Sequence, residues 1–202
     1  MMIAPGLELL LMGIRSVAEN FSVITTGIFM AGYFIGYFSG SQTTPKLVQK
    51  VGHIRVFAAF ASLASLSALL AAVYVNPVMW TLSRIITGIS LVSCYIVAES
   101  WLNDRATNKN RGQLLSAYMI ILYIGLGIGM LLLNVSNPKN YEPFILVSVL
   151  LSLALVPILL TKRPTPKFKK IGTISIKELY KISPLGAVSS FCTGVILSLI
   201  HI

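Results

Sequence analysis

The sequence consists of apolar runs of close to twenty residues separated by short polar segments, and this pattern allows few folds. A helix needs about 20 predominantly apolar residues to cross a bilayer, because each residue advances it by about 1.5 Å. Of the 202 residues, 55% are hydrophobic and only 11% are charged. A soluble domain carries roughly a quarter charged residues. The sequence therefore predicts an all-α integral membrane protein.

Six apolar runs predict six helices, and a seventh run begins near the end of the chain. The expected ranges are 1–14, 21–38, 56–75, 78–98, 112–135, 143–160 and 185–202. The first run is short for a span and lacks the basic start and cleavage site of a signal peptide. We expect it to be the far end of a helix whose beginning is missing.

This reading predicts three parts of the chain. They are an N-terminal transmembrane bundle over 1–161, a basic cytoplasmic linker over 162–183, and the truncated start of a second bundle over 184–202. The chain would then be a fragment that needs its missing C-terminal half.

The basic residues alternate between the predicted connections. Segments 46–55, 99–111 and 162–181 hold thirteen Lys and Arg residues, whereas the alternate connections hold only Arg15 and Lys139. Cytoplasmic loops carry an excess of Lys and Arg, so the three basic segments are predicted to face the cytoplasm from the inner membrane. The net charge of +10 does not indicate nucleic-acid binding, because the basic residues lie between apolar runs.

Cysteine and histidine give no sign of a metal site or a cofactor. Cys94 and Cys192 lie far apart within apolar segments and are expected to be buried thiols. His53 and His201 have no companions with the spacing of a metal site or an active site. A membrane-embedded enzyme is therefore disfavoured, and the predicted protein has no cofactor.

Small residues recur at helical spacing in two of the apolar runs. Gly32, Gly36 and Gly40 are spaced four residues apart, which places them on one face where another backbone can approach closely. Gly125, Gly127 and Gly129 have a similar packing role in the run 112–135.

Segment 45–55, PKLVQKVGHIR, resembles the signature loop between helices 2 and 3 of the major facilitator superfamily. Lys50, Gly52 and Arg55 match the family pattern, whereas Pro45 replaces its leading glycine and Gln49 its acidic residue. A positively charged turn of any multipass protein is the alternative.

Further motifs resemble the same family. Arg84 and Gly88, within RIITG, match its arginine–xxx–glycine motif in helix 4. An arginine within a span is costly and points to function, although one near the helix end can extend its side chain to the headgroups instead. The family's glycine–proline motif in helix 5 is only partly matched, because no proline is present.

Segment 97–119 resembles a branch of small bacterial permeases with unassigned substrates, and this likeness extends from helix 2 into helix 7. Its matching residues are Glu99 and the sequence Asn110-Arg111-Gly112. The family implies that Glu99 pairs with an inner-loop cation in a gating latch. Candidate partners are Lys50, Arg55, Arg105 and Arg111. Arg84 is excluded, because fifteen residues of helix correspond to about 22 Å. A solvated helix-end carboxylate is the alternative.

Three further polar residues in apolar runs are candidates to line a cavity. They are Glu8, Tyr118 and Tyr123. Glu8 is a possible site of proton coupling, whereas interhelical hydrogen bonding would explain the tyrosines equally well.

The resemblance implies a secondary transporter that moves a small solute, with protons as a candidate coupling ion, by alternating access between two six-helix bundles. The fragment alone would not transport. A non-transporting membrane scaffold or assembly factor is the alternative, and it would tolerate the loss of Arg84 and Glu99.

Overall fold

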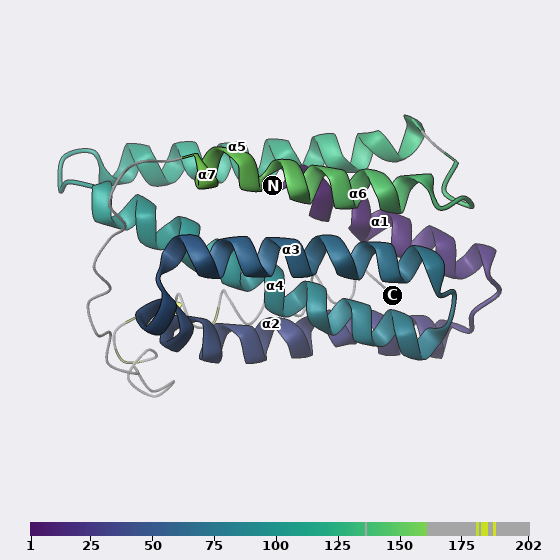
Figure 1. Ribbon diagram of the computed structural model, residues 1–202. Helices are drawn as coiled ribbons and strands as arrows, with labels where there is room; N and C mark the ends of the chain where they lie inside the picture. The colour runs from purple at the N-terminus through teal and green to yellow at the C-terminus, as the bar shows by residue number, and fades with distance from the viewer. Residues whose placement is uncertain (136, 161–180, 182, 186–187, 189–202) are drawn as a thin grey trace. The chain divides into compact units, whose positions relative to one another are not determined.

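The computed structural model describes residues 1–135, 137–160, 181, 183–185 and 188 (Figure 1). The elements of this part are all helical. They are α1 (Ile3–Ala18), α2 (Val23–Val51), α3 (His53–Val73), α4 (Pro77–Arg105), α5 (Arg111–Leu132), the 3-10 turn η1 (Leu133–Val135), α6 (Glu142–Leu153) and α7 (Leu155–Leu159). Five helices are long and apolar enough to span a bilayer, the last being α6 with α7. The predicted all-α membrane fold is confirmed.

The chain divides into two units, 1–166 and 167–202, and helices α1 to α7 belong to the first. The predicted linker over 162–183 and the predicted second bundle over 184–202 lie almost entirely outside the described residues. Both stay predictions.

The loop predicted over 46–55 is wrong, because α2 continues through it to Val51. Lys46, Gln49 and Lys50 have good helix propensity, and buried Val48 anchors the last turns. Pro45 lies inside the helix, where it removes one backbone hydrogen bond. Gly52 is then the entire connection to α3. Its φ of 90° belongs to the left-handed region that favours glycine, and this reverses the chain.

Two other helices also extend beyond their apolar runs. α1 continues from Ile14 to Ala18, and α4 continues from Ala98 to Arg105. The expected polar segments at 15–20 and 99–111 are therefore largely helical. Hydropathy marks the part of a helix that lies in the apolar layer, whereas the helix itself ends where its backbone is capped.

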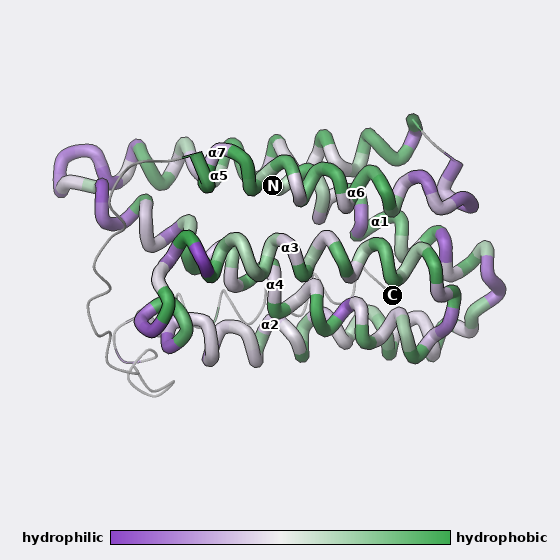
Figure 2. The backbone as a smooth tube through the Cα atoms, viewed as in Figure 1, coloured by the Kyte–Doolittle hydropathy of each residue, from purple (hydrophilic) through white to green (hydrophobic). Residues whose placement is uncertain are grey.

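The helices pack in two groups that share α3. α4 packs against α2 and α3, whereas α1 packs against α5 and α6, and α3 also contacts α6. Figure 2 shows hydrophobic residues along the helices and most hydrophilic residues at the turns at either end. This distribution suits a bundle whose middle lies in lipid.

Glycine brings α2 and α4 into backbone contact. A Cβ atom on Gly36 would collide with the carbonyl oxygen of Ile85, and one on Gly88 would collide with that of Tyr33. Gly32 and Gly40 lie on the same face of α2, where an added Cβ would come within 3.1 Å of the Thr81 carbonyl oxygen and 3.0 Å of the Ile89 Cα atom, respectively. Gly32, Gly36 and Gly40 therefore set the distance between α2 and α4.

A second glycine contact joins α1 to α5. A Cβ atom on Gly129 would collide with the carbonyl oxygen of Ile3, and one on Gly6 with that of Leu126. Gly125 lies against Met2, at 2.8 Å from an added Cβ to the Met2 Cβ. Gly127 differs, because an added Cβ would meet nothing within 4 Å. The packing role expected for Gly127 is therefore wrong.

We predict that Gly36→Ala destabilises the protein by about 1–3 kcal/mol, because the added methyl group must push apart two backbones. Gly127→Ala is the matched control. It adds the same methyl group into open space and should be neutral or stabilise by up to about 1 kcal/mol through helix propensity. Thermal unfolding of the purified protein would measure both. Equal effects would show that the α2–α4 contact is not tightly packed.

Candidate functional site

Glu8 of α1 and Arg84 of α4 form an ion pair inside the bundle. The Arg84 Nη1 atom donates to the Glu8 Oε1 atom at 3.2 Å. Glu8 is 3% exposed and Arg84 is 4% exposed, and they are the only buried Asp, Glu, Lys or Arg side chains among the described residues. Arg84 therefore does not extend to the headgroups, which was the alternative to a functional role.

Three further polar side chains surround this pair. The Tyr33 ring of α2 covers the Arg84 guanidinium, with its centroid 4.8 Å from Cζ. The Thr87 hydroxyl lies one turn beyond Arg84 and donates to Glu8 Oε1 at 3.4 Å. Thr87 also exchanges a hydrogen bond with the Ser67 hydroxyl of α3 at 2.7 Å. Four helices thus contribute to one buried polar network.

The ion pair connects helices that belong to different packing groups. α1 packs mainly against α5 and α6, whereas α4 packs against α2 and α3. Taking two charges out of water costs several kcal/mol for each ion, and two hydrogen bonds to Glu8 with one cation–π contact on Arg84 return only part of this. A pair kept at such a cost is by default a functional feature of a membrane protein.

The residues of the predicted signature loop lie at one end of the bundle. Lys50 and Arg55 are exposed on either side of the break at Gly52. Next to Gly52, the buried His53 ring stacks on Trp101 and its Nε2 atom lies 3.0 Å from the Ser100 hydroxyl. These contacts hold the start of α3 against α4.

Glu99 also lies toward this end of α4, but it is not within ion-pair distance of its predicted partners. It takes part in neither of the two ion pairs among the described residues, which are Glu8–Arg84 and Arg15–Glu19. The Tyr118 hydroxyl donates to Glu99 Oε1 at 3.5 Å. Arg111 instead donates to the Asn103 side-chain oxygen at 3.0 Å. The structure therefore brings Glu99 together with Tyr118 and not with the basic residues.

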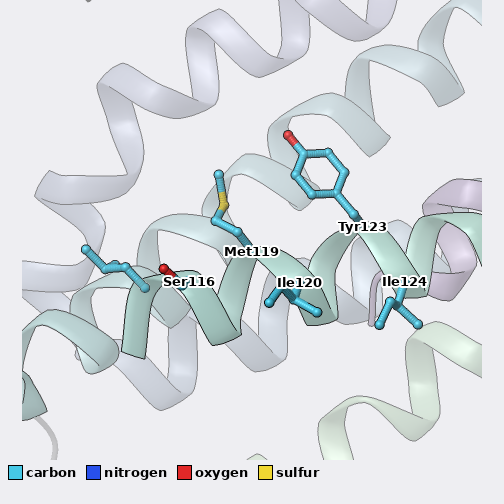
Figure 3. A pocket seen from close by; sticks show the side chains of 6 residues that line it. Ser116, Met119, Ile120, Tyr123 and Ile124 are labelled. Atoms are coloured by element: carbon cyan, nitrogen blue, oxygen red, sulfur yellow. The ribbon is translucent and has the colours of Figure 1, made fainter. Parts of the chain in front are cut away.

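Tyr123 lines a hollow of about 610 Å³ along α5 (Figure 3). The lining side chains all project from this one helix and are mostly apolar. They are Leu115, Ser116, Met119, Ile120, Tyr123 and Ile124. None of them belongs to the buried polar network, so the structure separates Tyr123 from Glu8.

Sequence reasoning missed Tyr33, Ser67 and Thr87. A signal for Thr87 was present, because its i, i+3 spacing from Arg84 places both on one helix face. Tyr33 lies three residues before Gly36. The glycines of this helix predict a closely packed neighbour, but the sequence does not say that this neighbour is α4. For Ser67 we find no signal in the sequence.

The chain matches the model of the Major Facilitator Superfamily over residues 1–201. The chain belongs to this superfamily. Its relatives include two proteins named "Uncharacterized MFS-type transporter YcaD". The one from Escherichia fergusonii is 25% identical over 185 residues, and the one from Escherichia coli O6:K15:H31 is 26% identical over 187 residues. Each alignment covers 91% of this chain and 48% of the relative.

The chain thus spans about half the length of these superfamily relatives. No solved structure matches it. The superfamily and the apolar helices together identify a multipass membrane protein.

We predict that Glu8→Gln or Arg84→Met alone destabilises the protein by about 3–5 kcal/mol, because each leaves a buried charge unpaired. The double variant should cost less than the sum of the two, with a coupling energy of about 0.5–3 kcal/mol. Denaturant unfolding of the four proteins in detergent would measure this. Strictly additive effects would mean that the two side chains do not interact.

Proposed function

We propose that this chain is the first half of a secondary active transporter that moves a small solute across the cytoplasmic membrane by alternating access. The observation that carries the proposal is the buried Glu8–Arg84 pair in a member of the Major Facilitator Superfamily. A paired charge inside a bundle is an expensive feature that a passive scaffold does not need. Solute sites of such carriers lie near the bilayer midplane between two bundles.

The proposed orientation places the basic segments in the cytoplasm, since they hold most of the Lys and Arg residues. In this orientation Lys50, Arg55, Glu99 and Arg111 lie toward the cytoplasmic end, where a gate of an alternating-access carrier would close. The latch between Glu99 and these cations stays a prediction. It would require a conformation other than the one described, because Glu99 has no cation within ion-pair distance among the described residues.

We further propose that the described bundle does not transport by itself. The solute would bind between this bundle and a second one, which relatives of about twice the length have room for. The proposed function is that of a carrier.

We also propose that the Glu8–Arg84 pair couples solute movement to protons. Glu8→Gln or Arg84→Lys in the full-length protein should then lower solute-driven proton movement at least about tenfold. Proteoliposomes containing a pH-sensitive dye would measure this over a panel of solutes. Glu142→Gln is the matched control. Glu142 is exposed, is the first residue of α6 and does not belong to the buried polar network around Glu8. Full activity in both pair variants would refute the proposed role and favour a scaffold.

The latch makes a separate prediction. Glu99→Gln in the full-length protein should alter transport and increase the time that the inner end stays open, because the carboxylate can no longer bind a cation. Labelling of Ser116→Cys, in a background without Cys94 and Cys192, by a membrane-impermeant maleimide applied from each side would report this. Unchanged uptake together with unchanged labelling would rule out the latch.

A further inference from the structure

Tyrosine side chains from three helices gather around Glu99. Tyr33 and Tyr37 lie one turn apart on α2, with ring centroids 6.0 Å apart. Tyr95 lies one turn before Glu99 on the same face of α4. From α5, the Tyr118 hydroxyl donates to Glu99 Oε1 at 3.5 Å. We call these four tyrosines and Glu99 the tyrosine cluster.

The polar atoms of the tyrosine cluster converge, although they come from α2, α4 and α5. The Tyr95 hydroxyl lies within electrostatic range of the hydroxyls of the other three tyrosines. The hydroxyls of Tyr37 and Tyr118 lie within that range of the Glu99 carboxylate. Tyr37 is 39% exposed and Glu99 is also exposed. The cluster is therefore accessible from outside the bundle.

Internal packing does not account for the tyrosine cluster. A tyrosine that only fills an interior normally finds a partner for its hydroxyl. No hydrogen bond joins the hydroxyls of Tyr33, Tyr37 or Tyr95 to another described residue. Glu99 has no cation within ion-pair distance in the described part of the chain, and its bond to Tyr118 is longer than the usual O–H···O limit of about 3.0 Å. The cluster thus offers aromatic rings, unused hydroxyls and one carboxylate that no cation neutralises.

This combination of groups suits an organic cation. The face of an aromatic ring is negative and attracts an ammonium group, and the Glu99 carboxylate adds a full negative charge. An anionic ligand would be repelled by both. A bound metal ion would need several oxygen, nitrogen or sulfur ligands, and the described residues contain no group of three His, Cys, Asp or Glu side chains that could hold one.

We propose that the tyrosine cluster binds the ammonium group of a cationic organic solute, with Glu99 neutralising its charge and the tyrosine rings around it. The inference rests on the proposed function and deepens it by naming the class of solute. The site is separate from the Glu8–Arg84 pair. The Tyr33 ring covers the Arg84 guanidinium, and fifteen residues of α4, about 22 Å, lie between Arg84 and Glu99.

The site and the proposed latch share Glu99. An inner-loop cation and the ammonium group of a solute would compete for the same carboxylate. In the described conformation Glu99 is paired with neither, which leaves it available to the solute. The latch would then close only after the solute has left. Solute release and closure of the inner end would be coupled in this way.

The test measures binding to the purified full-length protein in detergent by equilibrium dialysis, with benzyltrimethylammonium as the probe. Benzyl alcohol and benzoate are neutral and anionic controls that carry the same ring. We expect the cation to bind and the two controls not to bind. Equal binding of benzyl alcohol, or no binding of the cation, would overturn the inference without any variant.

Variants of Glu99 and Tyr37 test the two parts of the site. Glu99→Gln removes the charge and should lower the affinity for benzyltrimethylammonium at least about tenfold. Tyr37→Leu removes one ring and should lower it about 2- to 30-fold, whereas Tyr37→Phe keeps the ring and should stay within about twofold of the wild type. Unchanged affinity in Glu99→Gln or in Tyr37→Leu would contradict the assignment.

Tyr123→Leu is the matched control for the loss of a ring. Tyr123 is also an exposed tyrosine, but it lines the hollow along α5 and does not belong to the cluster. Its substitution should leave the affinity unchanged, and a fall equal to that of Tyr37→Leu would mean that the probe binds elsewhere. Both Glu99 and Tyr37 are exposed, so their variants should keep the thermal unfolding temperature of the wild type.

The same measurements distinguish this inference from the proposed function. If the cation does not bind while the protein transports a solute of another class, the cation site is wrong and the transporter stands. If the cation binds and both variants weaken it, but no solute crosses the membrane in proteoliposomes, the site is correct and the transport proposal is wrong.

Discussion

The buried pair of Glu8 and Arg84 is the interaction on which the arrangement of this bundle depends. It joins α1, which packs on α5 and α6, to α4, which packs on α2 and α3. A lipid environment offers no water to replace a lost partner, so each charge fixes the position of the other. The hydroxyls of Thr87 and Ser67 extend the connection to α3. Removing either charge would therefore affect both packing groups at once.

Glycine packing provides the close approach that this network needs. Gly36 meets the backbone of Ile85, the residue after Arg84, and Gly88 meets the backbone of Tyr33. Since both contacts are made by backbone atoms, α2 lies near enough for the Tyr33 ring to cover the guanidinium. The packing glycines and the charged pair are thus parts of one arrangement. A larger residue at either glycine would separate Tyr33 from Arg84 and change the environment of the ion pair.

The sequence predicted the helices well and their ends poorly. Hydropathy located the spans among the described residues, because a segment must be apolar where it meets lipid. It failed at 46–55 and 99–111, where polar residues of good helix propensity carry α2 and α4 beyond the apolar layer. In the site, Arg84 and Glu8 were both candidates because charge within an apolar run is rare. Their pairing was not predicted, since it depends on the relative rotation and depth of two helices that are 76 residues apart in sequence.

The sequence by itself determined the class of this protein and the positions of its described spans, and it singled out Glu8 and Arg84 as candidates. These follow from local chemistry, because the cost of placing a side chain in lipid depends mainly on that side chain. Tertiary structure alone decided which candidates meet. It placed Glu8 against Arg84, placed Glu99 beside Tyr118 rather than a cation, and left the Nε donor of Arg84 without a hydrogen-bond partner among the described residues. Such contacts depend on how several helices pack together, and no single segment of sequence contains that information.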